Sequence, residues 1–478
     1  MTFPFRLIFL SPRGISKPLF TSIVFSILNP YLNLGKHLLI QFSGVNRDRM
    51  VRIGEYLDRL GDDVVIDYEK HSEKHLPKAI MEKDPKTVFF KQPFENTDPL
   101  IANLYSTREK VEKLMGIEKG GLFKQMVMAK QNLVKPVERK DGWIENFSGP
   151  DRISRIPLLK YYEEDAGKYI TSSIIVAKDP EDGVVNMSVH RLLYLGSNRF
   201  AVRMVEGRHL HQIFMKHKAL NKNLKVAVLI GTPIHIILSA STQLPKDVSE
   251  IEYAGALNGK PLQVSYFDGY DLPVPLESEY VFEGSVRIDL TAREWMTDIL
   301  CLPDKPREQP VMEVERVYFN ENPIYHAILP GGLEHKFLMG YPAEVKIREV
   351  LLENGVDVRD IWLSNGSGGW LHCFVSISKK NNEEPSKVIS LVMEAHRSVK
   401  GVIVVDDDID PRSYEDIDFA LATRFQDKAK FYFFEKMRGS SLDPSSDQEK
   451  LLTSNWGLDL TLPKEIDRKR FLRSRIGS

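Results

Sequence analysis

The stretch Asn186-Met-Ser-Val-His-Arg191 carries an amide, a hydroxyl, an imidazole and a guanidinium in close succession. In an extended strand, the side chains of Asn186, Ser188 and His190 face one way, while Arg191 turns to the other side. One face of such a strand can hold a phosphate-bearing cofactor, and the arginine can fork onto a substrate carboxylate. The pattern therefore predicts a site that combines an anionic cofactor with an acid substrate.

Two later residues add the donors that a metal ion requires. His209 lies in Gly207-Arg-His-Leu-His-Gln212, and Glu250 lies in Ser249-Glu-Ile-Glu-Tyr-Ala-Gly255. With the Asn186 amide, this imidazole and this carboxylate can hold a hard divalent cation against a phosphate. The competing interpretation is that Asn186 occupies a hairpin turn and that His209 only begins a helix.

Two further histidines, His211 and His217, raise a histidine zinc site as a rival interpretation. His209 and His211 are two positions apart, which on a helix points their side chains towards different faces. This spacing disfavours zinc, so the Asn/His/Glu set is the preferred ligand interpretation.

In these motifs the chain resembles the UbiD-like decarboxylases, over about residues 50 to 440. The resemblance implies that Asn186, His209 and Glu250 ligate a divalent metal, Mn2+ or Mg2+, that also binds the cofactor phosphate, with K+ as a further candidate ion. It implies prenylated FMN as the cofactor, a flavin prenyltransferase as its supplier, and a homo-oligomer, either a dimer or a hexamer. The residues that it places at the cofactor are Thr171, Asn186, Ser188, Val189, His190, Arg191, His209, Ser241, Glu250 and Lys400.

The resemblance also places Arg191 in the active site beside paired acids. Relatives carry Glu-Gly-Pro-Phe-Gly, then Glu or Asp, after a Pro-x-x-x-Glu-x-x-x-Glu-Gly stretch, and that stretch is present here at 275–284. This chain continues as Thr291-Ala-Arg-Glu294-Trp-Met-Thr-Asp298, without the Gly-Pro pair and with the acids four positions apart instead of five. Glu294 and Asp298 are the expected acids, and the competing interpretation is a short amphipathic helix whose acids face water.

A decarboxylase must deliver a proton to the carbon that loses carbon dioxide, and a carboxylic acid kept neutral by burial can do this near neutral pH. We therefore expect Arg191 to orient the substrate carboxylate and Glu294 or Asp298 to protonate the product. The side chains alone provide no strong electron sink, so cleavage of the carbon–carbon bond requires the cofactor.

Segments 307–314 and 325–340 are similar to the archaeal branch of this family. That resemblance implies a phosphorylated unsaturated acid as substrate, with trans-anhydromevalonate 5-phosphate converted to isopentenyl phosphate in the archaeal modified mevalonate pathway. His335 and Lys336 are candidates for binding the substrate phosphate, unless this loop is instead a subunit-contact turn. The competing functions are decarboxylation of a 4-hydroxybenzoate-type quinone precursor and a non-catalytic role as a flavin-binding assembly protein. A split-barrel oxidoreductase is disfavoured because the sequence has no Rossmann fingerprint.

The elements that must position these residues form a mixed α/β (α+β) chain of several domains, because 478 residues exceed a single core. Short strands and helices over 46–140 predict a small N-terminal α/β domain. Strand-like segments joined by turns over 141–332, among them 170–177, 184–194 and 200–205, predict a central split β-barrel that binds the flavin. Alternating helices and strands over 333–440 predict a C-terminal α/β domain, and 441–478 are expected to be a tail or a dimer arm.

The run Asp406-Asp407-Asp408 resembles a metal site in isolation, but it follows a buried strand and is interpreted as a strand end with structural charges. Gly366-Ser-Gly-Gly369 lacks the Lys-Ser/Thr that a phosphate loop requires.

The bulk composition excludes several classes of function. With 65 basic and 66 acidic residues, no overall field favours nucleic acid or an anionic membrane. The two cysteines, Cys301 and Cys373, cannot form a disulfide framework and suit a reducing cytoplasm. Residues 1–45 are basic and contain no apolar run near the roughly 20 residues of a membrane span. We expect them to be an extension foreign to the enzyme, with the true start near Met50.

Overall fold

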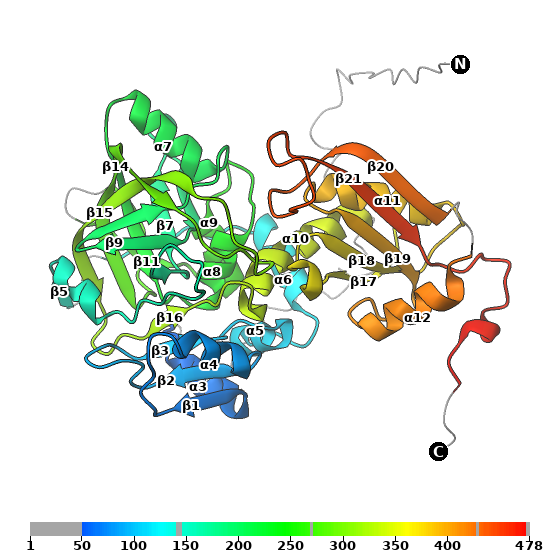
Figure 1. Cartoon of the computed structure of the whole chain (residues 1–478), viewed down its shortest axis with the longest axis horizontal. Helices are drawn as coiled ribbons and strands as arrows, with labels where there is room; N and C mark the ends of the chain where they lie inside the picture. The colour runs from blue at the N-terminus through cyan, green and yellow to red at the C-terminus, as the bar shows by residue number, and fades with distance from the viewer. Residues whose placement is uncertain (1–49, 140–145, 268–270, 427–429, 475–478) are drawn as a thin grey trace.

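The computed structural model describes residues 50–139, 146–267, 271–426 and 430–474, so the expected extension 1–45 lies outside the described residues. The long helix α10, Leu333–Glu353, lies between a larger body and a C-terminal lobe (Figure 1). The larger body holds a four-, a nine- and a three-stranded sheet, and the lobe holds a five-stranded sheet. The mixed helix-and-sheet class expected from the sequence is confirmed. In the described ranges, no helix has both the length and the apolar character to cross a membrane.

A four-stranded sheet with the order β1-β2-β3-β16 forms one end of the larger body (Figure 1). Its last strand, β16, comes from much later in the sequence and pairs with β3 in parallel. The elements are α3 Glu55–Leu60, β1 Val64–Asp67, α4 Leu76–Lys83, β2 Thr87–Phe90, β3 Leu100–Ala102, α5 Arg108–Met115, α6 Leu122–Gln131 and β16 Tyr325–Ala327.

The central sheet has nine strands in the order β6-β9-β10-β15-β14-β11-β7-β8, with β5 added on β15. The neighbouring strands run antiparallel throughout. In the described chain the path ends at β6 and β8, so the expected split barrel is an open, curved sheet rather than a closed one. The strands are β5 Asn146–Ser148, β6 Tyr169–Ile170, β7 Ile174–Lys178, β8 Val185–Val189, β9 Leu192–Gly196, β10 Arg199–Val202, β11 Leu224–Ile230, β14 Tyr280–Glu294 and β15 Arg307–Phe319.

Two strands predicted as continuous are each broken. Segment 170–177 divides into β6 and β7, and segment 184–194 divides into β8 and β9. The breaks face each other: Ile170 pairs with Leu192 and Ile174 with Val189, which leaves 171–173 opposite His190 and Arg191. The His190 N–H donates to the Ser173 carbonyl at 3.0 Å, so backbone bonding continues across an irregular step. Such bulges redirect side chains. The Arg191 carbonyl still accepts from the Arg203 N–H at 3.1 Å, so its backbone stays bonded to the segment after β10.

Three helices cover the end of this sheet near β8. Helices α8 Ile234–Ser241 and α9 Glu250–Asn258 pack on each other and on β8, and their apolar residues share one core with β7 and β11. Helix α7, His209–Ala219, contacts β7, β8, β11 and β14, and its buried apolar residues belong to the core on the other face of the sheet. A three-stranded sheet joins β4 Val137–Glu138, β12 Gln263–Ser265 and β13 Val274–Pro275.

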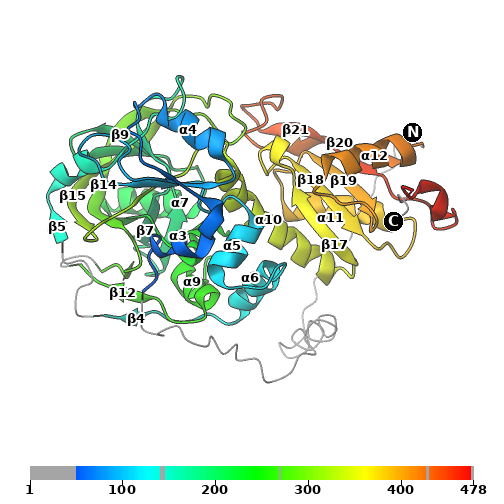
Figure 2. The same cartoon turned by 90° about the horizontal axis from the view of Figure 1, so that it is seen from below.

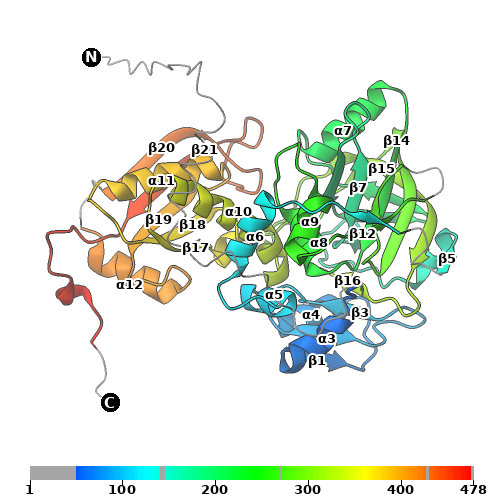
Figure 3. The ribbon, with the colours of Figure 1, turned by 180° about the vertical axis from the view of Figure 1, so that it is seen from behind.

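The C-terminal lobe is a five-stranded sheet with the order β17-β18-β19-β21-β20 and helices on both faces (Figures 2 and 3). Alternate strand residues feed two cores, one with the second half of α10 and α11, and the other with α12. The elements are β17 Val358–Leu363, β18 His372–Ile377, α11 Glu384–Ala395, β19 Gly401–Asp406, α12 Tyr414–Arg424, β20 Phe431–Arg438 and β21 Leu452–Asp459.

The expectation that 441–478 form a tail or arm is wrong for part of that range. Strand β21 lies between β19 and β20, parallel to the former and antiparallel to the latter. Its polar composition hides a buried alternation in which Asn455, Gly457 and Asp459 face the interior. The other domain boundaries expected from the sequence stay a prediction.

Candidate active site

Arg191 and Glu294 form a buried, bidentate ion pair. Arg191 lies at the step between β8 and β9, and Glu294 is the last residue of β14, with no exposed surface. Arg191 Nε donates to Glu294 Oε1 at 2.7 Å and Nη2 donates to Oε2 at 3.1 Å. This fork is the strongest geometry available to an arginine and a carboxylate, and it fixes the plane of the guanidinium. Glu294 therefore belongs to a strand end, and the amphipathic-helix interpretation is wrong.

Asp304 is a third member of this group that the sequence interpretation missed. Arg191 Nη2 donates to Asp304 Oδ2 at 3.2 Å, and Arg307 Nη1 donates to Asp304 Oδ1 at 2.6 Å. Although burial opposes ionisation, these two guanidinium groups hold the pKa of Asp304 below its usual value. Asp304 lies beside Arg191 because residues 295–303 fold back on themselves, with a β-bridge between Thr297 and Pro303. Only this return of the chain makes the acid a neighbour of Arg191, and sequence spacing carried no signal of it.

Asp298, the second acid expected from the sequence, occupies a different position. Its Oδ1 accepts hydrogen bonds from the N–H groups of Leu300 at 2.8 Å and Leu302 at 3.0 Å, which closes the turn 298–302. Among the described residues, no hydrogen bond joins it to Arg191. Burial raises the pKa of Asp298, although the two backbone N–H groups oppose the rise. The carboxyl group is therefore easier to protonate than an ordinary aspartate.

Two more side chains bound the ion-pair group. The Tyr169 hydroxyl lies 3.1 Å from Glu294 Oε1 and 2.7 Å from the carbonyl oxygen of Trp295. Burial, and next the charge of Glu294, raise the pKa of Tyr169, which keeps the phenol protonated. Burial, and next the charge of Arg191, lower the pKa of His335 to about 4. His335 is therefore a neutral neighbour of Arg191 at ordinary pH and supplies no positive charge for a phosphate.

The polar side chains of β8 form a short hydrogen-bonded row, as the strand periodicity predicted. Ser188 Oγ lies 2.9 Å from Asn186 Oδ1 and 2.9 Å from His190 Nε2, and His190 Nδ1 lies 2.9 Å from the Arg203 carbonyl. Burial lowers the pKa of His190 to about 4, so its ring is neutral and Nδ1 carries the hydrogen that this carbonyl accepts. Nε2 and Asn186 Oδ1 then both require a donor, and the serine hydroxyl has one hydrogen. One of these two acceptors is left for another donor or a cation.

Glu250 meets Asn186 at the start of α9. Its carboxylate accepts from the Met187 N–H at 3.1 Å and lies 3.4 Å from Asn186 Nδ2. Burial raises the pKa of Glu250 to about 7, and no cationic side chain pairs with it in the described part of the chain. A carboxylate without a cationic partner, next to an amide whose oxygen has only the shared Ser188 hydroxyl as donor, fits a hard divalent cation.

His209, the third expected ligand, is the first residue of α7, and among the described side chains it is not hydrogen-bonded to Asn186 or Glu250. In the described ranges, no three His, Cys, Asp or Glu side chains cluster as metal ligands. The expected ligand set has only two side chains of these kinds, His209 and Glu250. Its third ligand would have to be the Asn186 amide oxygen.

The remaining residues expected at the cofactor are engaged elsewhere. Thr171 Oγ1 lies 2.9 Å from the Tyr161 hydroxyl and accepts from the Ile328 N–H at 3.0 Å. Ser241 Oγ donates to the Ile237 carbonyl inside α8. Lys400 pairs with Asp443 at 2.8 Å on the C-terminal lobe. Val189 ends β8 opposite Ile174. The structure thus joins Asn186, Ser188, His190 and Glu250 by hydrogen bonds, and among the described residues neither Ser241 nor Lys400 is hydrogen-bonded to them.

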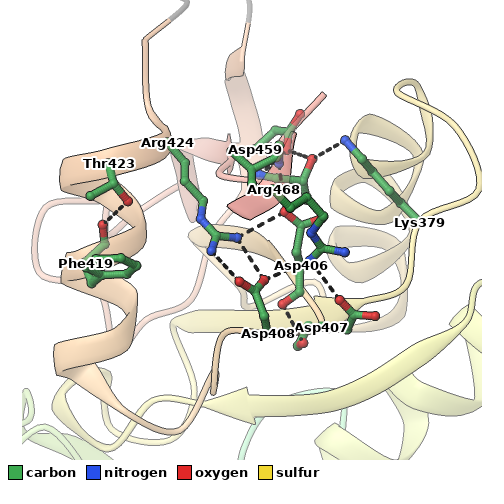
Figure 4. Close-up of polar contacts among 12 residues, drawn as sticks. Lys379, Asp406, Asp407, Asp408, Phe419, Thr423, Arg424, Asp459 and Arg468 are labelled. Carbon is green, nitrogen blue, oxygen red and sulfur yellow. Dashed lines mark hydrogen bonds and ion pairs between the residues drawn. The ribbon is translucent and has the colours of Figure 1, made fainter. Parts of the chain in front are cut away.

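The acidic run at the end of β19 is a structural ion-pair cluster, as interpreted from the sequence (Figure 4). Arg424 of α12, whose side chain is completely buried, donates to Asp406 at 3.1 Å and to Asp408 at 2.6 Å. Arg468 from the C-terminal segment donates to Asp407 and Asp408, each at 2.9 Å. These carboxylates are neutralised by the chain itself.

Comparison with known proteins finds matches over most of the chain. Residues 136–333 match the sequence model of the UbiD 3-octaprenyl-4-hydroxybenzoate carboxy-lyase Rift-related domain, and residues 336–460 match the corresponding C-terminal domain. The anhydromevalonate phosphate decarboxylase of Methanocaldococcus jannaschii is 36% identical over 88% of this chain and 99% of that protein. The protein of the same name from Methanothermobacter thermautotrophicus is 33% identical over 85% of this chain and 96% of that protein.

Two solved structures are similar to this chain in fold over most of its length. The UbiD-class enzyme HmfF of Pelotomaculum thermopropionicum in complex with FMN has a TM-score of 0.84 and 26% identity, covering 89% of this chain and 97% of that one. An evolved dimeric form of the same enzyme in complex with prFMN has a TM-score of 0.80 and 25% identity, covering 87% of this chain and 96% of that one.

Proposed function

Because the chain belongs to the UbiD family of carboxy-lyases, as the resemblance in its motifs predicted, we propose that it is a non-oxidative decarboxylase that uses prenylated FMN. We propose trans-anhydromevalonate 5-phosphate as its substrate and isopentenyl phosphate as its product. The relatives named for anhydromevalonate phosphate decarboxylation support this choice, because the similarity extends over nearly their whole length. The single observation that supports the chemistry best is the buried pair of Arg191 and Glu294.

Arg191 orients the substrate carboxylate in this proposal. Its Nε and Nη2 groups are occupied by Glu294 and Asp304, while no described acceptor is hydrogen-bonded to Nη1. The side chain is 19% exposed, so this free edge can reach a ligand. Burial opposes the charge of Arg191, but Glu294 and Asp304 raise its pKa, which keeps the guanidinium positive towards a carboxylate.

Asp298 is the acid that we propose as proton donor. Glu294 holds a buried guanidinium with both oxygens, so protonating it would leave a buried charge without its partner. Asp304 is ionised between two arginines, and its lowered pKa leaves it without a proton to donate near neutral pH. Asp298 has a raised pKa and one oxygen that accepts no hydrogen bond from a described residue. Two acids on Arg191 and a third beside them also disfavour the non-catalytic interpretation.

Prenylated FMN, when bound, supplies the electron sink that the side chains lack. We propose that Asn186, His209 and Glu250 hold its phosphate through Mn2+ or Mg2+, with K+ as a further ion, because the carboxylate and the amide oxygen there lack a cation in the described part of the chain. Lys400 would join them only after exchanging Asp443 for the phosphate. The loop that carries Asp443 lies on the side of the lobe that faces the central sheet (Figures 1 and 3).

The cellular setting is also proposed. We expect a cytoplasmic homo-oligomer supplied with cofactor by a flavin prenyltransferase. Two free cysteines, one of them exposed, support a reducing compartment.

The test is co-expression with a flavin prenyltransferase, followed by absorbance and mass analysis of the released cofactor and assay of the phosphorylated acid. Release of prenylated FMN together with formation of carbon dioxide and isopentenyl phosphate is expected. Arg191→Ala should keep the flavin and lose turnover. A wild-type protein that is loaded with prenylated FMN and leaves the phosphorylated acid unchanged would exclude this substrate.

A further inference from the structure

A cavity of about 250 Å3 lies where three parts of the fold meet. The start of α5 contributes one wall, the first half of α10 contributes another, and the C-terminal lobe around the end of β17 closes the third side (Figures 1 and 3). The ion-pair group of Arg191 is not among its lining residues. Aromatic and apolar side chains, including Phe337, Tyr341 and Trp362, form much of the wall, and basic groups enter it from two sides.

Arg108 is the first of these basic groups, and it lacks hydrogen-bond partners among the described residues. Its Nη1 lies 3.9 Å from Asp360 and its Nη2 lies 3.9 Å from Glu109, and both distances are too long for hydrogen bonds. Its Nε is buried without any acceptor, although the side chain as a whole is 23% exposed. A buried N–H of a guanidinium costs free energy unless an oxygen accepts from it. The guanidinium therefore has unused capacity at the cavity.

Lys336 is the second basic group. It lies on the first turn of α10, is partly buried, and forms no hydrogen bond or ion pair through its side chain to any described residue. Its charge is felt by Asp84, but the Asp84 carboxylate accepts from the Leu333 N–H and lies outside salt-bridge range of Lys336. The cavity thus holds two cations from different elements: Arg108 has two acids at 3.9 Å but no hydrogen bond to either, and Lys336 has no ion pair with a described residue.

The acids near the cavity are already committed to a different cation. Arg412 donates to Glu344 at 3.0 Å, to Asp360 at 2.6 Å and to the Ile361 carbonyl at 2.7 Å. Glu109 is 56% exposed and turns its charge to solvent. The hydrogen-bonded pairing of Arg412 contrasts with the two long ion-pair contacts of Arg108, at 3.9 Å, and with Lys336, which has no ion pair among the described residues.

We propose that this cavity binds the phosphate group of a small phosphorylated molecule, with Arg108 and Lys336 as the groups that hold the phosphate. A guanidinium forks onto two oxygens and an ammonium adds a point charge, which together suit a dianionic phosphate better than a single carboxylate. Phe337 and Trp362 cover the carbon skeleton. The volume is below the roughly 300–1,000 Å3 of most small-molecule pockets, so the ligand is a compound of a few carbons rather than a nucleotide.

Two sources of this phosphate share the same chemistry. One is the phosphate of the decarboxylated acid itself, which rests on the function proposed above. The other is a separate phosphorylated metabolite, which does not. In either case the ligand bridges the larger body and the C-terminal lobe, so its binding favours the arrangement in which the two are held together.

The test uses the flavin-loaded protein, so that the cofactor phosphate site is filled, and inorganic phosphate as the probe. Thermal unfolding is followed with increasing phosphate at ionic strength held constant with chloride. Wild-type protein and Lys346→Met, which removes a lysine of the same helix outside the cavity lining, should be stabilised increasingly as the phosphate concentration rises above its dissociation constant. Arg108→Gln and Lys336→Met should each lower the apparent phosphate affinity by about tenfold or more, the scale of a lost charged hydrogen bond.

Steady-state kinetics with the phosphorylated acid separate the two sources. A raised KM with unchanged kcat in Arg108→Gln and Lys336→Met supports the substrate phosphate, while an unchanged KM beside lost phosphate stabilisation supports a separate metabolite. The proposal is overturned if phosphate stabilises the wild-type protein no more than chloride does, or if all four proteins respond alike. Failure of the proposed function would instead appear as a wild-type enzyme that binds phosphate but does not turn over the acid.

Discussion

Asp304 Oδ2 lies 3.2 Å from Arg191 Nη2, so the active-site arginine is held by two acids from opposite ends of one folded-back loop. Glu294 precedes the loop as the last residue of β14, and Asp304 follows it shortly before β15. Asp298, within the loop, is left to close a turn and keeps one oxygen available. The three acids are therefore expected to differ in role, and substitution can separate them.

Asp298→Asn should lower kcat by about 10²–10⁴-fold with little change in KM, because an amide cannot donate the proton that general acid catalysis requires.

Asp304→Asn should mainly raise KM, by about tenfold or more, because Arg191 loses one of the charges that orient it. Both variants should retain flavin. Asp289→Asn, on the exposed part of β14, is the matched control. Near wild-type kcat in Asp298→Asn would assign the proton to another group.

Glu250→Gln should release the metal and with it the flavin. The carboxylate contributes negative charge beside the Asn186 amide, and an amide in its place binds a divalent cation weakly. Metal analysis and flavin absorbance after purification should both fall at least tenfold, by order of magnitude. Glu252→Gln, two residues along α9, should keep both. Equal metal and flavin content in the two variants would remove Glu250 from the ligand set.

Acid should destabilise the C-terminal lobe through His396. The imidazole is buried against Trp370, with ring centroids 4.2 Å apart, and burial, then the charge of Lys346, lower its pKa to about 4. A histidine in the unfolded chain has a pKa near 6.5. Between about pH 6.5 and 4, the unfolded chain therefore binds a proton at His396 that the folded lobe does not bind. Stability from this group is complete above about pH 6.5 and is lost as the pH falls towards 4, on the order of 3 kcal/mol in all.

Urea unfolding from pH 7 to pH 4.5 measures this effect. His396→Gln should flatten the pH dependence, whereas His75→Gln, at an exposed position, should leave the wild-type slope. His190 and His335 have pKa values lowered to about 4 as well, so part of the slope should remain in His396→Gln. Identical slopes in wild type and His396→Gln would show that the imidazole protonates freely in the folded lobe.

Gly401→Ala should destabilise the lobe because Trp456 of β21 covers that position. An added Cβ would lie 2.3 Å from Trp456 Cζ2, so the indole must move. Overpacking of this kind costs about 1–3 kcal/mol, readable as a lower urea midpoint. Trp456→Leu in the same chain should recover part of the loss, since it frees the space. An unchanged midpoint for Gly401→Ala would mean that the tryptophan ring shifts without cost.

Much of the fold follows from periodicity, and its failures have physical reasons. The strand-like segment 200–205 is confirmed as β10, Arg199–Val202, although the strand ends three residues earlier than predicted. The steps at 171–173 and 190–191 were not predicted, because a bulge keeps the same residue types as the strand it interrupts. Strand β21 was mistaken for a tail because the residues that it buries, Asn455 and Gly457 among them, are small or polar.

The residues of the candidate site also divide into those that the sequence could predict and those that it could not. Residues close in the sequence, such as Asn186, Ser188 and His190, could be placed on one face from strand geometry alone. Glu250 and Asn186 were matched through family motifs, and the structure places them in contact. Asp304 could not be found, because its position depends on how a loop returns rather than on any local pattern. The lack of a hydrogen-bond acceptor for Arg108 Nε is likewise a property of the folded neighbourhood.

The parallel pairing of β16 with β3 has a consequence for how the protein is made. The first sheet stays incomplete during synthesis until Tyr325–Ala327 have left the ribosome, long after its other three strands. Until then β3 presents an open edge that invites pairing with other chains. The N-terminal unit is therefore unsuited to expression as a fragment ending near 140, and the nascent chain needs the central sheet before its first sheet can close.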